Sequence, residues 1–277
     1  MSMVSPLHAS ARRIAAIDEY IAFDIDTTTG DGWGAWGEVI DGGHLDAFFD
    51  QVAAGHDGRA LPKDTTAAFL GGGFVAALVS APVALLVLEQ RVPQFTPADL
   101  SIHRHSAGYF DRVAFGDGRF AALPSDPDAD HAAAVIVASV DELSHQLAAA
   151  VVQCLEPVLA EIRRRAPFGL RGLWGFVGDE AASVELTVAP DREPTISKRF
   201  VDAVAALTPH LRTRPTLCTI DGPNGPHRFS IRSSCCLWYK TPGAEDRIAN
   251  GEFAYCSTCP LPDDADRRQQ LRANLDA

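Results

Sequence analysis

AAFLGGGFVAALVSAPVALLVL, residues 67–88, is free of charged residues and long enough to cross a lipid bilayer. Three consecutive glycines (71–73), Ser80 and Pro82 argue against a membrane span, and so do the mixed charges and the missing aromatic belt at its ends. The pattern favours two buried core helices that meet near Pro82, where the proline ring interrupts the hydrogen-bond ladder. The alternative is a transporter-associated protein that uses this stretch as an anchor.

The composition is that of a soluble globular protein. The chain has 277 residues, of which 47% are hydrophobic and 22% are charged, and these values argue against intrinsic disorder. With 36 acidic and 24 basic residues the formal charge is −12, which argues against a nucleic-acid partner. The first 20 residues lack the shape of a secretion signal. We therefore expect a cytoplasmic protein without a transmembrane segment, and leave peripheral contact with a membrane open.

Hydrophobic periodicity predicts helices and strands in blocks rather than in alternation. Leucines and valines at four-residue spacing predict a helix over 141–165, capped by Asp141 and kinked or split at Pro157. Gly116-Asp117-Gly118 between apolar runs predicts a hairpin within 101–124. Further helices are expected at 6–22, 44–55, 169–187 and 196–207, and further strands at 133–140, 216–220 and 227–234.

This order of elements indicates an α+β fold. We expect a mainly helical N-terminal part (1–98), packed with an antiparallel sheet and helices in an α+β body (99–222). A C-terminal cysteine-rich segment (223–277) completes the chain. The three parts can form one compact unit, because a chain of this length buries most of its unfolded surface in one core or two.

The cysteines are distributed unevenly. Cys154 and Cys218 lie within a predicted helix and a predicted strand, and we expect both to be small, buried hydrophobic side chains. Four others fall near the C-terminus: Cys235, Cys236, Cys256 and Cys259. Four thiols grouped in this way in a cytoplasmic chain indicate a metal site. Vicinal cysteines suit a single zinc ion less well than a cluster, because in an extended chain their side chains point to opposite faces. Ligand chemistry therefore favours iron–sulfur first, zinc second and a redox dithiol third.

The sequence around these cysteines resembles a known family. RSSCCLWYK (232–240), followed by CSTCPL (256–261), is similar to the C-terminal signature of the FhuF-type ferric siderophore reductases. The match is tight over about 30 residues, and a looser similarity reaches upstream to 67–88 and to the stretch that holds Arg171, Trp174 and Asp179. One departure is clear: 19 residues separate Cys236 from Cys256, where family members usually have about ten. This extra stretch is polar and is expected to form a loop or a short helix.

The resemblance implies an enzyme that reduces siderophore-bound ferric iron in the cytoplasm. In this family four cysteines hold a 2Fe–2S cluster, which here would be the C-terminal four. The chain lacks a dinucleotide-binding fingerprint, since the glycines at 71–73 have the wrong spacing and context. A separate electron donor, a ferredoxin or a flavoprotein, is therefore expected. The alternative function is a zinc-stapled siderophore-binding or biosynthesis-related protein without redox activity.

Substrate contacts are expected close to the vicinal cysteines. Residues 227–240 carry three basic residues and no acid, and a basic patch there would attract an anionic ferric chelate. Nearby aromatic residues can cover a cluster or stack on a ligand, although packing in the core is their commoner role. The candidate substrate residues are Arg228, Arg232, Lys240, Trp238 and Tyr239, to which the looser resemblance adds Arg171 and Trp174.

Overall fold

The computed structural model describes residues 4–26, 30–40, 43–55, 58–105, 108–223 and 225–276. It is 53% helix and 15% strand, which confirms the α+β class. The helices are α1 (Leu7–Ile17), α2 (Trp36–Ile40), α3 (Gly43–Ala53), α4 (Lys63–Glu89), α5 (Val140–Arg165), α6 (Leu170–Val188), α7 (Ile196–Leu207), α8 (Pro242–Ala249) and α9 (Asp264–Asp276). Single 3₁₀ turns lie at Glu19–Ile21, Pro97–Asp99 and Trp238–Lys240.

The strands form three small sheets. The first has the order β1 (Phe23–Ile25), β5 (Phe110–Phe115), β4 (Leu100–Arg104), β2 (Trp33–Ala35), and the second has the order β3 (Arg91–Pro93), β6 (Phe120–Ala122), β7 (Ala134–Ile136). The third is the hairpin of β8 (Thr216–Gly222) and β9 (Gly225–Ile231), and Asn224 of its predicted turn lies outside the described residues. The β1–β5 and β6–β7 pairs are parallel, so the sheets are mixed rather than wholly antiparallel.

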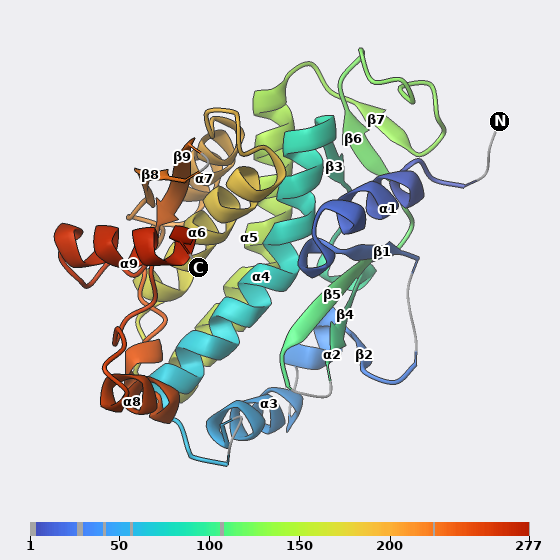
Figure 1. Ribbon diagram of the computed structural model, residues 1–277. Coiled ribbons are helices and arrows are strands. Elements are labelled where there is room, and N and C mark those ends of the chain that lie inside the picture. Colours follow the sequence, from blue (N-terminus) through green and yellow to red (C-terminus); the bar gives the residue numbers. More distant parts are fainter. Residues whose placement is uncertain are drawn as a thin grey trace.

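Helix α4 runs through the middle of the molecule (Figure 1). One side faces α5 and α6, and the other faces the sheet that contains β5. A Cβ atom on Gly71 would lie 2.3 Å from Leu173 Cδ2, so a larger residue here would have to displace the Leu173 side chain, and α4 and α6 pack closely. In the part of the chain that the structure describes, α4 is the one helix long and apolar enough to span a membrane, and 78% of its most apolar window is buried inside the protein. That burial is expected of a core helix.

The prediction that 67–88 forms two helices was wrong, because α4 is continuous and Pro82 lies inside it. A proline in a helix interior costs about 3 kcal/mol. Leu78, Val79, Val83, Leu85 and Leu86 are all fully buried around it. Burying each such side chain contributes about 1.5–3 kcal/mol, so packing outweighs the interrupted ladder. Helix α5 likewise continues past Pro157, and its N-cap is Ser139 rather than Asp141.

The predicted hairpin at 116–118 was also wrong. Strand β5 pairs with the preceding β4, whereas β6, which follows the Gly116–Gly118 turn, pairs with β3 and β7 in another sheet. The turn thus connects two sheets instead of two paired strands. A local turn signal marks a reversal of the chain, but the pairing partner is chosen by distant residues.

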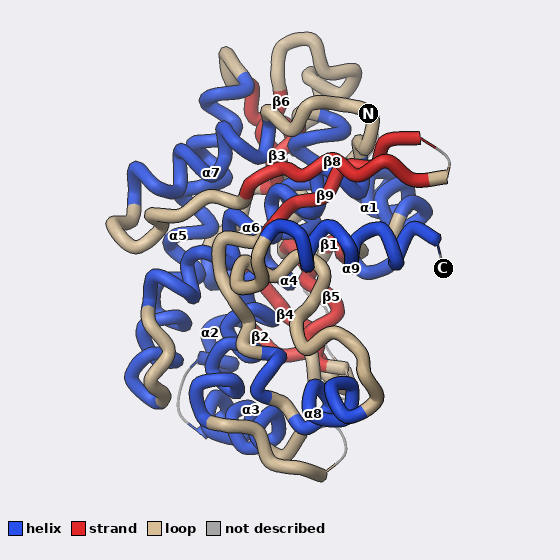
Figure 2. Tube along the Cα trace, turned by 60° about the vertical axis from the view of Figure 1, so that its left-hand side comes forward, coloured by secondary structure: helices blue, strands red, loops and turns tan. Residues whose placement is uncertain are grey.

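The hydrophobic core is shared between the predicted N-terminal part and the predicted body. One continuous cluster extends from Leu7 in α1 to Leu211 beyond α7. A second, smaller cluster joins the β8–β9 hairpin to α9 through Cys218, Ile220 and Leu271. Helix α9 lies beside this hairpin (Figure 2). The β8–β9 hairpin and α9 therefore share a small apolar cluster of their own.

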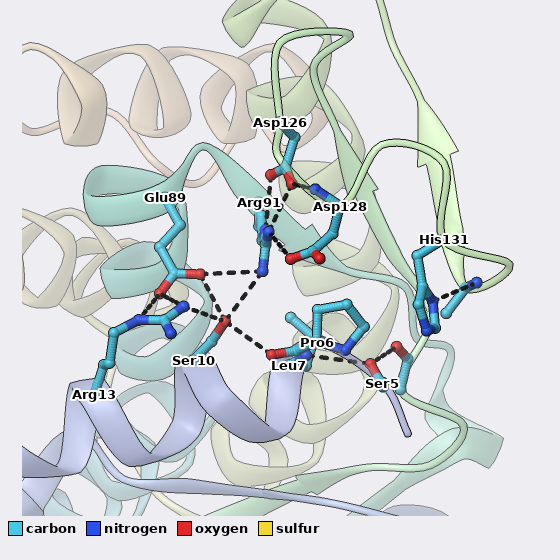
Figure 3. Close-up of polar contacts among 12 residues, drawn as sticks. Ser5, Pro6, Leu7, Ser10, Arg13, Glu89, Arg91, Asp126, Asp128 and His131 are labelled. Atoms are coloured by element: carbon cyan, nitrogen blue, oxygen red, sulfur yellow. Dashed lines mark hydrogen bonds and ion pairs between the residues drawn. The ribbon is translucent and has the colours of Figure 1, made fainter. Parts of the chain in front are cut away.

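A buried ion-pair network ties α1 to the loop after β6 (Figure 3). The guanidinium of Arg91, whose side chain is 4% exposed, donates to Asp126 at 2.6 and 2.7 Å and to Asp128 at 2.6 Å. Glu89 accepts from Ser10 at 2.6 Å and from Arg13 at 2.7 Å. Burial opposes the charge of Arg91, but its hydrogen bonds to the two aspartates outweigh burial and raise its pKa above the ordinary value. The network thus links α1, the end of α4 and β3 to the loop after β6.

Candidate metal centre

Two loops bring the four C-terminal cysteines together. The vicinal pair follows β9, and the Cys256–Cys259 loop follows α8, the short helix formed within the lengthened stretch. The backbone N–H of Arg232 donates to the carbonyl of Thr258 at 3.0 Å and so joins the two loops. The Cys256–Cys259 turn is closed by the Cys259 N–H, which donates to the Cys256 carbonyl at 2.9 Å. Segments some 20 residues apart in sequence thereby meet at one place.

The four thiols form a row. Sγ of Cys235 lies 3.8 Å from Sγ of Cys259, and the side chain of Cys256 contacts those of both Cys259 and Cys236. The order is therefore Cys235, Cys259, Cys256, Cys236, with the vicinal cysteines at the two ends. Cysteines 256 and 259 bridge the gap between them.

The donor set suits a metal group that binds through pairs of thiolates. Two sulfurs on one tetrahedral ion, each about 2.3 Å from the metal, lie about 3.8 Å apart, which is the Cys235–Cys259 spacing. All six cysteines are free thiols. Across the described ranges, no group of three or more His, Cys, Asp or Glu side chains is arranged to hold a metal ion as it stands. The geometry thus supplies paired thiols but does not by itself identify a metal.

Two hydrogen-bond donors point at the sulfurs. Leu237 adopts a left-handed conformation (φ 61°), and its N–H donates to Sγ of Cys235 at 3.3 Å. Nη1 of Arg232 donates to Sγ of Cys236 at 3.3 Å. Contact with the Cys259 thiol, together with the Leu237 N–H, lowers the pKa of Cys235 to about 7. Contacts with the Cys236 and Cys259 thiols, followed by the Arg232 charge, lower the pKa of Cys256 well below its usual range. The thiolate form, which binds metals, is favoured at these two positions.

Asp179 on α6 holds the loop of the vicinal cysteines. Its Oδ1 accepts the N–H of Ser233 at 2.6 Å, and its Oδ2 accepts the N–H of Ser234 at 3.0 Å. The residue is 6% exposed, and burial raises the pKa of its carboxyl against the effect of these two donors. One helical turn earlier, a Cβ atom on Gly175 would lie 1.9 Å from Ser234 Oγ. Helix α6 therefore fits closely against this loop.

Helix α9 holds the other loop. Gln270, 5% exposed, donates from Nε2 to the Tyr255 carbonyl at 2.8 Å. Arg267 donates to the carbonyls of Cys259 at 3.1 Å and Pro262 at 2.6 Å. These bonds satisfy backbone acceptors that a loop cannot satisfy by itself. Each cysteine loop is thus fixed by buried or half-buried polar side chains from a neighbouring helix.

A cavity of about 820 Å³ opens beside one end of the thiol row. Cys236 and Cys256 line it together with Arg228 and Arg232, and α4 and α6 form the remaining walls. Its volume lies within the range of small-molecule sites in proteins. A molecule bound there would lie beside Cys236 and Cys256.

The predicted basic substrate residues divide between this cavity and the surface. Arg232 and Arg228 line the cavity, although Arg228 also pairs with Glu193 at 2.9 Å. Lys240 does not line it: its ammonium lies 2.7 Å from Asp64, and this hydrogen bond raises the pKa of Lys240. Such partly exposed pairs contribute little to stability.

The predicted aromatic contacts lie away from the cavity. Trp238 lines a separate apolar cavity, and the Arg247 guanidinium stacks 5.4 Å from the centroid of its ring. The ring of Tyr239 lies 5.2 Å from that of Tyr255. Trp174 is 1% exposed within the core, and Arg171 is exposed at the start of α6. Arg171 and Trp174 do not line the cavity either.

Sequence reasoning did not identify Asp179 or Glu180 as residues of the site. Both belong to α6, and Glu180 lines the cavity. A signal was present, because two adjacent acids interrupt the otherwise apolar run LWGFVGDEAA (173–182). The expectation that Cys154 and Cys218 are buried small hydrophobes is confirmed, since they are 0% and 6% exposed.

Neither a family model nor a curated protein matches this chain.

Proposed function

We propose that this chain binds a 2Fe–2S cluster through Cys235, Cys236, Cys256 and Cys259 and reduces ferric iron in siderophore complexes. The observation that carries the proposal is the row of four thiols whose Cys236 and Cys256 end lines the 820 Å³ cavity. A 2Fe–2S cluster requires four ligands in two pairs, one pair for each iron. Cys235 with Cys259, and Cys256 with Cys236, provide two such pairs.

When bound, the cluster supplies one electron at a time, which is the number that ferric iron needs to become ferrous. The hard oxygen ligands of a siderophore hold Fe(III) much more tightly than Fe(II), so reduction releases the metal. The ferric chelate would occupy the cavity, where its iron lies near the cysteines. The electron would come from a separate protein in the cytoplasm, a ferredoxin or a flavoprotein.

The protein's own residues would bind the ferric chelate and hold the cysteine loops in place. Arg228 and Arg232 place positive charge on the cavity wall and favour an anionic chelate. Arg232 and the Leu237 N–H also donate to sulfur, and such hydrogen bonds raise the potential of a cluster. Asp179 and Gln270 hold the two cysteine loops in position through hydrogen bonds to their backbones.

The test is anaerobic purification followed by visible absorption, metal analysis and EPR of the reduced protein. We expect a reddish protein with two irons per chain, which releases ferrous iron from a ferric siderophore when a reductant is supplied. A colourless protein with one zinc per chain would contradict the proposal and support the zinc-stapled alternative.

Cysteine variants test the ligand set. Serine at any one of the four proposed ligands should remove or destabilise the cluster. Cys154→Ala and Cys218→Ala should keep the spectrum, because both thiols are buried among apolar residues in other parts of the fold. Loss of colour in Cys218→Ala with retention in Cys236→Ser would overturn the ligand assignment.

A further inference from the structure

Ser80 has one hydroxyl hydrogen and two oxygen neighbours at hydrogen-bond distance. Oγ of Ser80 lies 2.6 Å from the Ala76 carbonyl and 2.6 Å from Oε1 of Glu180. A hydroxyl has one hydrogen, and a carbonyl can only accept. If Ser80 donates to Ala76, as a serine inside a helix commonly does, the hydrogen between Ser80 and Glu180 must belong to Glu180. Only a protonated carboxyl carries such a hydrogen.

The surroundings of Glu180 favour the neutral acid for an independent reason. Glu180 is half-buried between α4 and α6, and part of its surface lines the large cavity. Burial raises the pKa of Glu180, and the opposing effects of Ser80 and the Arg232 charge are smaller. No ion pair to Glu180 within 4 Å is found in the described part of the chain. Burial therefore favours the neutral carboxylic acid of Glu180 over its carboxylate.

We propose that Glu180 is a carboxylic acid that donates its proton to the ferric chelate in the cavity as the chelated iron is reduced. This inference rests on the proposed function. In the step, the iron of the substrate gains one electron and becomes Fe(II), and the cluster is oxidised by one electron. The O–H bond of Glu180 breaks, an O–H bond forms on a ligand oxygen of the chelate, and the bond from that oxygen to iron breaks. Glu180 is left as a carboxylate.

Ser80 provides the route by which the proton returns. On the other side of its contact with Glu180, Ser80 lines a second cavity of about 30 Å³, enough for a water molecule. Tyr20, Asp111 and Arg112 also line this small cavity. A proton can pass from water to the Ser80 hydroxyl while the hydroxyl's own proton passes to Glu180. The Ser80–Glu180 pair thus connects the small cavity with the large one through the contact of α4 with α6.

The other charged groups around Glu180 have different roles. On α6, the Asp179 carboxylate is occupied by two backbone donors. From the β9 side, Arg228 and Arg232 are cations without a proton to give at neutral pH, and Cys236 and Cys256 are the proposed ligands. Beyond Ser80 lie Asp111, which contacts His103, and Arg112, which contacts Asp24. Of these groups, Glu180 is the acid that lines the large cavity and whose carboxyl is not held by backbone donors.

Infrared spectroscopy tests the protonation state without substrate turnover. Glu180→Gln is the test variant, because a glutamine amide can still donate to Ser80, and Glu156→Gln on the exposed face of α5 is the matched control. We expect a protonated carboxyl band at neutral pH that Glu180→Gln removes and Glu156→Gln keeps. Retention of every such band in Glu180→Gln would overturn the proposal. This result does not depend on a cluster, so it separates failure of this inference from failure of the proposed function.

Single-turnover oxidation of the reduced protein tests the proton donation. A siderophore complex of redox-inert gallium(III) measures binding, and the ferric complex measures electron transfer. We expect Glu180→Gln to bind the gallium complex within about twofold of wild type, but to transfer its electron about 100-fold more slowly, the low end for loss of a general acid. Ser80→Ala should keep the first turnover and slow the later ones. An unchanged first turnover in Glu180→Gln would refute the role.

Discussion

Removing the Asp179 carboxylate should loosen the vicinal-cysteine loop selectively. The carboxylate accepts two buried backbone N–H groups, at 2.6 and 3.0 Å. A hydrogen bond to a charged group contributes about 1.5–3 kcal/mol. Asp179→Asn keeps one acceptor, so we expect the free energy of unfolding to fall by about 1.5–3 kcal/mol. Asp179→Ala removes both acceptors and should lower it by about 3–6 kcal/mol.

The same loss should appear in the rate at which the proposed cluster leaves the protein. If release requires local opening of this loop, 1.5–3 kcal/mol corresponds to a rate about 10- to 100-fold faster in Asp179→Asn. The assay follows the decay of visible absorbance in the presence of an excess of an iron chelator. Unfolding is measured in parallel by urea titration.

Glu185→Gln is the matched control, because Glu185 lies on the same helix and holds two backbone N–H groups in the same way. Its carboxylate accepts from Ile196 at 3.2 Å and from Ser197 at 2.7 Å, at the start of α7 and away from the cysteines. We expect a comparable loss of unfolding free energy without faster chelation. If both variants lose the metal group at the same rate, Asp179 has no special role in holding the cysteine loop.

Three further changes test other parts of the structure. Gly175→Ala places a Cβ 1.9 Å from Ser234 Oγ and should lower the free energy of unfolding by about 1–3 kcal/mol. Gly37→Ala, at an exposed position of α2 where a Cβ meets no atom within 4 Å, should not lower the melting temperature. Asp126→Asn breaks the buried pair with Arg91, in which both side chains are 4% exposed. It should lower the free energy of unfolding, measured by urea titration, by about 3–5 kcal/mol. An effect no larger than that of Asp130→Asn, at an exposed position, would contradict this. Burial raises the pKa of Cys154 from 9.0 to about 12. The buried neutral thiol therefore contributes fully to the free energy of unfolding below pH 9, and this contribution is lost as the pH rises towards 12. Between pH 9 and pH 12 the free energy of unfolding of wild type should fall by up to about 4 kcal/mol more than that of Cys154→Ala. If the free energies of unfolding of both proteins fall equally with pH, the raised pKa of Cys154 is refuted.

Much of the helical framework follows from local sequence. The helices at 169–187 and 196–207 agree with α6 and α7 to within a residue, since an apolar face at helical spacing is both the signal in the sequence and the surface that packs. The burial of Cys154 was predictable for the same reason. Where prediction failed, at Pro82 and at the 116–118 turn, a local preference was outweighed by contacts with distant residues.

Within the candidate centre, the sequence by itself determined which thiols fall close together along the chain. The grouping of Cys235, Cys236, Cys256 and Cys259 is visible in the chain because cysteines this close together need little tertiary structure to meet. Their order in the row is not visible, since it depends on how the Arg232–Thr258 hydrogen bond aligns the two loops.

Only the tertiary structure decided what surrounds those thiols. The approach of α4 to α6 at Gly71 places Ser80 against Glu180, 100 residues further along the chain. The packing of α6 against β9 places Asp179 below the vicinal cysteines and opens the cavity beside Cys236. Acidic and hydroxyl side chains have no periodic signature of their own, so their roles depend on the neighbours that packing supplies.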